Sequence, residues 1–211
     1  MFVELIELLR CPRAHEESAL VASSLRSEAR HIVDGVLGCP VCRGEFPIAG
    51  GVAQFGEPAN ATPDVAPDAP TAMRLAAFLE LTDARGFALV CGGWSAHVDF
   101  IRRLSETPVV LVNPPSGAPT GGAAGVIRTD DVVPFAALVA RGLALHEQAT
   151  DAFAASAVRT VRSGGRIVAP ASLPLPASVA ELARDDQMWV GEKTTTPEAA
   201  SRPVSIRRAT R

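Results

Sequence analysis

The sequence contains no tyrosine and only one lysine, Lys193, so arginine supplies almost all of its positive charge. No apolar run is long enough to span a bilayer. The first residues also lack the positive segment and long apolar stretch of a signal peptide. These absences predict a cytoplasmic protein without membrane contacts. The net charge of −3 gives no overall positive field, so the composition does not indicate nucleic-acid binding.

The composition is otherwise that of a globular protein with a buried core. Hydrophobic residues make up 47% of the chain and charged residues 20%. A length of 211 residues fits one large domain or two small ones. In a reducing compartment, the four cysteines are expected to be metal ligands or buried thiols rather than disulfides.

The most specific motif is Cys39-Pro40-Val41-Cys42, which can form one half of a metal clip. Two thiols separated by a tight turn can both point at one ion about 2.3 Å away. A second turn begins at Cys11-Pro12 but has Ala14 where a second cysteine is expected. His15 follows directly and is the natural fourth ligand. The sequence therefore predicts a zinc site made of Cys11, His15, Cys39 and Cys42.

Two alternatives to this zinc site stay open. The segment could have lost its metal and kept the cysteines as buried thiols. His31 could act as the fourth ligand, although it lies far from either turn in the sequence. If four protein ligands close the site, the zinc ion has a structural and not a catalytic role.

The helix and strands expected within residues 1–56 are short, and a core this small needs an additional stabilising element. The apolar spacing predicts a helix over 2–10. Alternating segments predict strands at residues 18–21, 31–34, 44–48 and 51–55. A polar loop is expected over 22–30, between the first two strands. A unit of this size has a thin core, and a metal ion would stabilise it.

This first part resembles the small zinc-ribbon proteins that activate tRNA, rRNA and release-factor methyltransferases. The resemblance rests on the helix that runs into Cys11-Pro12 and on the segment 35–42, and it ends in Phe46-Pro47-Ile48 and Gly50-Gly51-Val52. Ala14 departs from the family pattern. The resemblance implies a protein partner, either a methyltransferase or another translation-related protein.

Residues 57–71 contain four interspersed prolines and predict a semi-rigid linker. From residue 72 the pattern alternates between helix and strand, which predicts a parallel sheet covered on both faces. We expect strands at 87–91, 109–112, 125–128, within 135–145 and at 166–169. We expect helices at 72–79, 98–104 and 151–162, a turn at 163–165, and a closing helix and hairpin at 182–190 and 203–208. The predicted fold class is α/β, with a zinc-ribbon-like domain (1–56) followed by a Rossmann-like domain (72–211).

The second part resembles class I S-adenosylmethionine-dependent methyltransferases, especially those of ubiquinone biosynthesis. The resemblance rests on three segments: the Asp-then-Pro-Phe segment 130–135, the helix-turn-strand 157–168, and the terminal segment from 188 to 208. It implies a cofactor pocket at the ends of the first three strands. Within that pocket it assigns Gly92, Gly93, Asn113 and Asp130, with Asp131 as an alternative to Asp130.

The implied pocket departs from the family at four positions. Trp94 and Ala96 stand where the family has glycines, Val90 replaces an acidic residue, and Asn113 replaces the carboxylate that holds the ribose. An asparagine is a weaker acceptor than a carboxylate. Asp130 could instead be a solvated residue that caps a turn.

These departures favour a binding, scaffolding or regulatory protein with a degenerate cofactor pocket. One alternative is an active S-adenosylmethionine-dependent methyltransferase that uses Asn113 and Asp130. Another is a ribbon that activates a separate methyltransferase. Cys91 is expected in the core, and His97 and His146 are expected at the surface or as capping residues. The arginines near the end lack interleaved aromatic residues, which makes them weak evidence for RNA binding.

Overall fold

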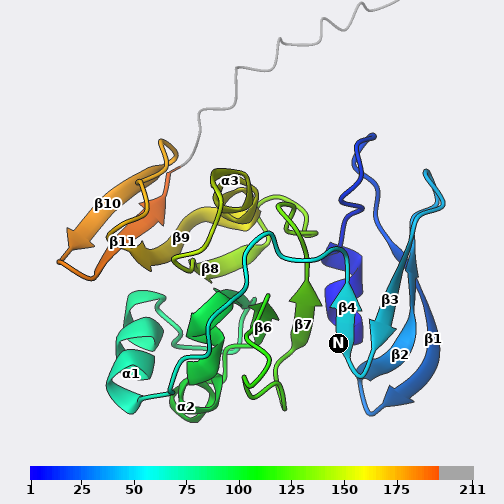
Figure 1. Cartoon of the computed structure of the whole chain (residues 1–211), viewed down its shortest axis with the longest axis horizontal. Helices are drawn as coiled ribbons and strands as arrows, with labels where there is room; N and C mark the ends of the chain where they lie inside the picture. The colour runs from blue at the N-terminus through cyan, green and yellow to red at the C-terminus, as the bar shows by residue number, and fades with distance from the viewer. Residues whose placement is uncertain (195–211) are drawn as a thin grey trace, which may run out of the picture.

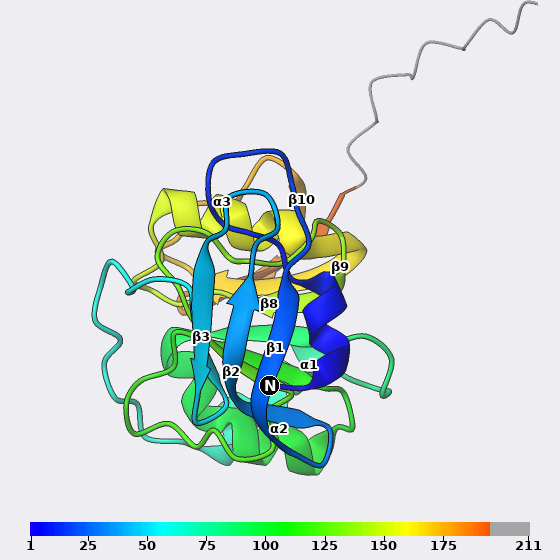
Figure 2. The ribbon, with the colours of Figure 1, turned by 90° about the vertical axis from the view of Figure 1, so that its right-hand side faces the viewer.

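The computed structural model describes residues 1–194, whose strands form one continuous twisted sheet (Figure 1). The strand order is β1-β2-β3-β4-β7-β6-β5-β8-β9-β11-β10. In Figure 2, β1 to β3 run upright while β8 and β9 run across the view, which shows how far the sheet twists. Helices cover both faces. The predicted α/β class with a Rossmann-like sheet is therefore confirmed.

The centre of the sheet is parallel. Its strands are β5 (Ala88–Cys91), β6 (Val109–Val112), β7 (Gly125–Arg128), β8 (Ala140–Ala144) and β9 (Val161–Pro170). From β5 the chain adds β6 and β7 on one side and then returns to add β8 and β9 on the other. The order thus reverses between β5 and β8, and open α/β sheets bind ligands beside such a switch point, at the carboxyl ends of the strands.

The N-terminal strands extend this sheet. They are β1 (Val21–Glu28), β2 (His31–Gly38), β3 (Glu45–Ala49) and β4 (Val52–Gln54). β4 pairs with β7 in parallel, so that Val52 lies opposite Val126. The polar loop predicted over 22–30 is wrong, because most of it is β1. β1 is an exposed edge strand held by backbone pairing with β2, so neither of its faces needs an apolar pattern.

Helices α1 (Ala69–Phe78) and α2 (Val98–Leu104) cover one face of the sheet. Helix α3 (Asp151–Thr160) and the 3-10 helix η1 (Val3–Leu8) cover the other. Side chains cap the first turns of α1 and α3. Asp68 accepts a hydrogen bond from the Thr71 amide at 2.7 Å, and Thr150 accepts one from Phe153 at 3.0 Å. A second 3-10 helix, η2 (Gly92–His97), follows β5 directly.

The helix predicted over 182–190 is wrong. These residues belong to a hairpin formed by β10 (Val179–Arg184) and β11 (Met188–Lys193), with β11 antiparallel to β9. Trp189 is fully buried on β11 and lies opposite Ala169 of β9. The turn predicted at 163–165 lies inside β9, where the β8–β9 register jumps from Val161 to Arg166. The hairpin expected at 203–208 lies outside the described residues.

The N-terminal strands and the parallel sheet share one apolar core. Leu9 pairs with Phe135 in an isolated bridge, and the Phe2 amide donates to the Ala124 carbonyl at 2.7 Å. The centroid of the Phe135 ring lies 5.1 Å from that of Phe87, which directly precedes β5 in the same buried cluster. The sheet and the core therefore continue across residue 56. No helix within the described residues is long and apolar enough to cross a membrane.

Candidate functional site: a cysteine–histidine cluster and a filled switch point

The structure brings together Cys11, His15, Cys39 and Cys42. Their ligand atoms all lie within 4.8 Å of one another. The Cys39 turn follows β2, and the backbone amide of Cys39 donates to the Gly44 carbonyl at 2.9 Å, which closes the turn. The loop that carries His15 is folded back beside this turn. Such a cluster could hold a zinc ion.

The distances within the cluster fit tetrahedral zinc. Zn–S and Zn–N bonds of about 2.3 and 2.0–2.1 Å place two sulfurs about 3.8 Å apart and a sulfur and a nitrogen about 3.6 Å apart. The Cys11 and Cys42 sulfurs are separated by 3.7 Å, and Cys39 Sγ lies 3.4 Å from His15 Nε2. His15 Nδ1 contacts the Glu16 carbonyl at 2.6 Å. That bond leaves Nε2 free to bind metal, as an outer-shell carbonyl does in zinc sites.

The electrostatics of the cluster favour at least one thiolate. Burial by itself would raise the pKa of Cys39, but the backbone amides of Cys42 and Val41 outweigh it and bring the pKa to about 6. The pKa of Cys42 is also lowered, because the Gly44 amide offsets the effect of burial. Burial raises the pKa of Cys11 to about 11. The thiolate is the form that binds metal.

The four residues predicted to bind a nucleotide cofactor lie at the carboxyl edge of the sheet. Gly92 and Gly93 follow β5, Asn113 follows β6 and Asp130 follows β7. Gly92 has a φ of +58°, and a Cβ there would lie 2.5 Å from the His146 ring. His146 therefore occupies the space that the glycine leaves open, so this space is not free for a cofactor.

Asn113 is committed to the backbone of its own chain. Its side-chain nitrogen donates to the Thr129 carbonyl at 2.9 Å, and its oxygen accepts from the Thr129 amide at 2.8 Å. The side chain is 3% exposed and holds the ends of β6 and β7 together. Each of these atoms makes one bond to Thr129, and burial of the side chain leaves it little access to a ribose hydroxyl.

The two aspartates after β7 also have local roles. Asp130 accepts from the Val132 amide at 3.2 Å, as a turn-capping residue does, although its side chain is exposed. Asp131 accepts from the Thr150 hydroxyl at 2.5 Å, which ties it to the start of α3. Asp130 is the more exposed of the two, and Asp131 is half-buried.

Residues 57–68, which we call the strap, run from the end of β4 to α1 across the carboxyl edge of the sheet (Figure 1). Within the part of the chain that the structure describes, three hydrogen bonds join the strap to the loops at the strand ends. Asn60 donates to the Gln148 carbonyl at 3.0 Å, Thr62 donates to the Asn113 carbonyl at 3.1 Å, and the Asp68 amide donates to His97 Nδ1 at 3.1 Å. Val65 packs against Gly93. Most of the strap is otherwise exposed, so few contacts fix it.

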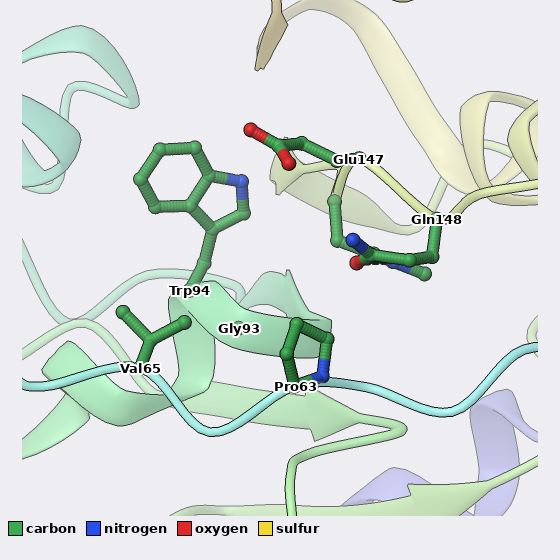
Figure 3. A pocket seen from close by; sticks show the side chains of 7 residues that line it. Pro63, Val65, Gly93, Trp94, Glu147 and Gln148 are labelled. Carbon is green, nitrogen blue, oxygen red and sulfur yellow. Dashed lines mark hydrogen bonds between the residues drawn. The ribbon is translucent and has the colours of Figure 1, made fainter.

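The strap and the strand ends leave little free volume. The cavity at the β5–β8 switch point measures about 180 Å³ and is lined by Pro63, Val65, Gly93, Trp94, His146, Glu147 and Gln148 (Figure 3). A second space beside Asn113 and Asp130 measures about 10 Å³. Small-molecule sites usually measure about 300–1,000 Å³. Neither space accommodates a nucleoside cofactor in this arrangement.

His97 and His146 were expected at the surface or as caps, and both are buried, at 2% and 7% exposed. His97 accepts a hydrogen bond from the strap, and His146 fills the glycine loop. Their position after β5 and β8, at the switch point, is the sequence signal that could have placed them at this edge. The strap residues carried no such signal.

Acidification is expected to destabilise this edge. Burial lowers the pKa of both His97 and His146. The unfolded chain therefore binds more protons below pH about 6.5, and stability falls as the pH drops from there toward the folded-state values. Each unit of pKa separation costs about 1.4 kcal/mol. Denaturant unfolding at pH 7 and 5.5 measures this loss.

The variant His97→Asn is the matched control for the pH dependence. Its side-chain oxygen can still accept from the Asp68 amide, but it does not titrate. We expect a smaller loss of stability between pH 7 and 5.5 than in the parent protein. An equal loss in both proteins would show that His97 does not contribute.

Comparison with known proteins shows a similar fold and no further similarity. No family model matches the chain, and no curated protein matches it. Among solved structures, geranyl diphosphate C-methyltransferase from Streptomyces coelicolor A3(2) has 16% identity and a TM-score of 0.38, covering 47% of this chain and 44% of that one. The chain thus spans less than half the length of that enzyme.

Two further structures are similar to the chain. One is a Corynebacterium glutamicum protein from a structural genomics consortium. It has 16% identity and a TM-score of 0.44, and the match covers 64% of this chain and 84% of that one. The other is the Haloferax volcanii complex of the Trm112 methyltransferase activator with a methyltransferase. It has 14% identity and a TM-score of 0.37, and the match covers 47% of this chain and 50% of that one. The strand order β7-β6-β5-β8-β9-β11-β10, with β11 antiparallel, is itself that of a methyltransferase-like fold.

Proposed function

We propose that this protein is a non-catalytic binding or scaffolding protein, built from a zinc-ribbon-like segment and a methyltransferase-like fold. The observation that carries the proposal is the filled switch point. His146 packs into the space at Gly92, and Val65 of the strap packs on Gly93. Where methyltransferases use a glycine loop to approach the cofactor, this chain uses the same loop to pack its own side chains.

The proposed cluster metal is a structural zinc ion held by Cys11, His15, Cys39 and Cys42. The separations of 3.7 and 3.4 Å between ligand atoms support this set. All four tetrahedral positions would be taken by protein atoms, which leaves no open position for a substrate. The zinc ion would contribute folding energy to the β2–β3 end of the sheet.

The pairing of β4 with β7 supports action within one chain over activation of a separate methyltransferase. In the resembling activators, an exposed apolar surface binds a partner enzyme. Here Met1, Leu5 and Leu9 are buried in the core shared with the parallel sheet. The edge of β4 is likewise occupied by β7 of the same chain. A protein partner would therefore bind another surface.

The proposal predicts that S-adenosylmethionine does not bind the full-length protein. Calorimetric titration at protein concentrations near 50 µM would detect a Kd of about 100 µM or tighter. We expect no saturable heat, because neither cavity is large enough and Asn113 is occupied. Binding of micromolar strength would overturn the non-catalytic assignment and favour the alternative, an active methyltransferase that uses Asn113 and Asp130.

A strap variant makes this titration sharper. Asn60→Ala with Thr62→Ala removes two of the three polar contacts that hold the strap. His146 and Asn113 would still occupy their positions. We therefore expect this double variant also to show no saturable heat. If it binds S-adenosylmethionine where the parent protein does not, the strap alone closes an intact site.

A further inference from the structure

The 180 Å³ cavity at the switch point has an unusual lining, with an indole and a carboxylate at its walls (Figure 3). Trp94 comes from η2, which follows β5, and Glu147 comes from the loop after β8. Pro63 and Val65 of the strap supply an apolar side. The cavity thus combines elements from both sides of the point where ligands usually bind in such sheets.

Trp94 is held in place by its own hydrogen bond. Its indole N–H donates to the Leu145 carbonyl at 2.5 Å. The N–H is therefore already used and is not available to a ligand. What the indole still offers is its π system, and tryptophan is the aromatic side chain that attracts cations best.

Glu147 carries an exposed carboxylate with no hydrogen bond or ion pair to any residue within 1–194. Among residues 1–194, no arginine or lysine lines the cavity. The neighbouring His146 is buried, and burial lowers the pKa of its imidazole, so the ring is neutral at pH 7. The charge facing this cavity is thus negative, and an ionised carboxylate can only accept hydrogen bonds.

We propose that this cavity binds a small organic cation, an alkylated ammonium group, between Trp94 and Glu147. A single aromatic wall beside a carboxylate matches the chemistry that recognises such groups. The volume of 180 Å³ excludes a nucleoside but leaves room for a compact ammonium head. The proposal goes beyond the scaffolding role and names a ligand class for the space that the strap leaves open.

The test is a titration of the full-length protein with choline and tetramethylammonium, followed by tryptophan fluorescence. Trp94 is half-buried, whereas Trp189 is fully buried, so a ligand in the cavity reports through Trp94. The control ligand is 3,3-dimethyl-1-butanol, which has the shape of choline without the charge. We expect saturable quenching by the cations and roughly tenfold weaker binding of the neutral alcohol.

Variants separate a specific site from a merely apolar hollow. Glu147→Gln should weaken choline binding several-fold, whereas Glu106→Gln, the same change at an exposed site on the opposite edge of the sheet, should leave it unchanged. Trp94→Leu, measured by calorimetry, should abolish binding. Equal affinity for the neutral alcohol, no effect of Glu147→Gln, or no saturation would each overturn the proposal. None of these outcomes depends on the titration with S-adenosylmethionine, which tests the scaffolding role separately.

Discussion

Replacing Cys39 with serine is expected to abolish zinc binding and to lower the melting temperature of the whole chain in one transition. Cys39 is 3% exposed, and its sulfur faces His15 Nε2 at 3.4 Å. Structural zinc contributes about 10–16 kcal/mol in isolated zinc fingers. Even a loss of about 4 kcal/mol would lower the melting temperature by roughly 8–16 °C in a chain of this size.

A single transition is expected because the cluster is not isolated from the rest of the fold. It lies next to β2 and β3, which are joined to the parallel sheet through β4. Unfolding followed by far-ultraviolet circular dichroism and by tryptophan fluorescence should therefore coincide, because Trp94 and Trp189 both lie outside the N-terminal segment. If only the dichroism responds early, the N-terminal segment unfolds independently.

Elemental analysis gives the matching chemical test. We expect about one zinc ion per native chain, and less than a tenth of that in Cys39→Ser. Cys91→Ala is the matched control, because Cys91 is buried in β5, away from the cluster, and its removal should leave the zinc content unchanged. Native protein without zinc would contradict the site itself. Full zinc content in His15→Ala would contradict only the assignment of His15.

Replacing Asn113 with aspartate is expected to destabilise the fold without restoring a cofactor site. The change supplies the carboxylate that the resembling methyltransferases carry at this position. Here, however, the Asn113 amide nitrogen donates to the Thr129 carbonyl, and a carboxylate would place oxygen against oxygen in a buried site. A lost buried donor of this kind costs about 1–3 kcal/mol, and more when a charge is introduced.

The cost of Asn113→Asp is expected to depend on pH. Burial and the facing carbonyl raise the pKa of the new carboxyl above its unfolded value of about 3.9. The protonated form can donate to Thr129, so the penalty is small below that value and grows as the pH rises toward the folded-state pKa. Denaturant unfolding of variant and parent at pH 4 and pH 7 measures the difference.

Asn113→Ala provides the control. It removes both hydrogen bonds without adding a titratable group, so its cost should not change between pH 4 and 7. An Asn113→Asp protein as stable as the parent at pH 7 would contradict the role assigned to the amide. Micromolar binding of S-adenosylmethionine by this variant would favour the alternative of an enzyme-like pocket.

The sequence by itself determined most of the local structure. Continuous apolar runs marked β5, β6 and β7 because a strand buried on both faces needs no polar alternation. The Cys39-Pro40-Val41-Cys42 turn and Cys11 with His15 predicted a cysteine–histidine cluster, because two thiols at that spacing can point at one ion, and the structure brings the four residues together. Where both faces of a strand are exposed, as in β1, no apolar pattern marks the strand, and the sequence predicts a loop instead.

Only the tertiary structure decided what the switch point holds. Asn113, His146 and Val65 come from three distant segments, and no local pattern shows that they meet at one edge of the sheet. The same holds for β4 and β7, whose pairing joins the ribbon-like segment to the methyltransferase-like sheet. Packing between distant segments depends on the whole fold. This packing places side chains in the space beside the glycine loop, which the local sequence does not reveal.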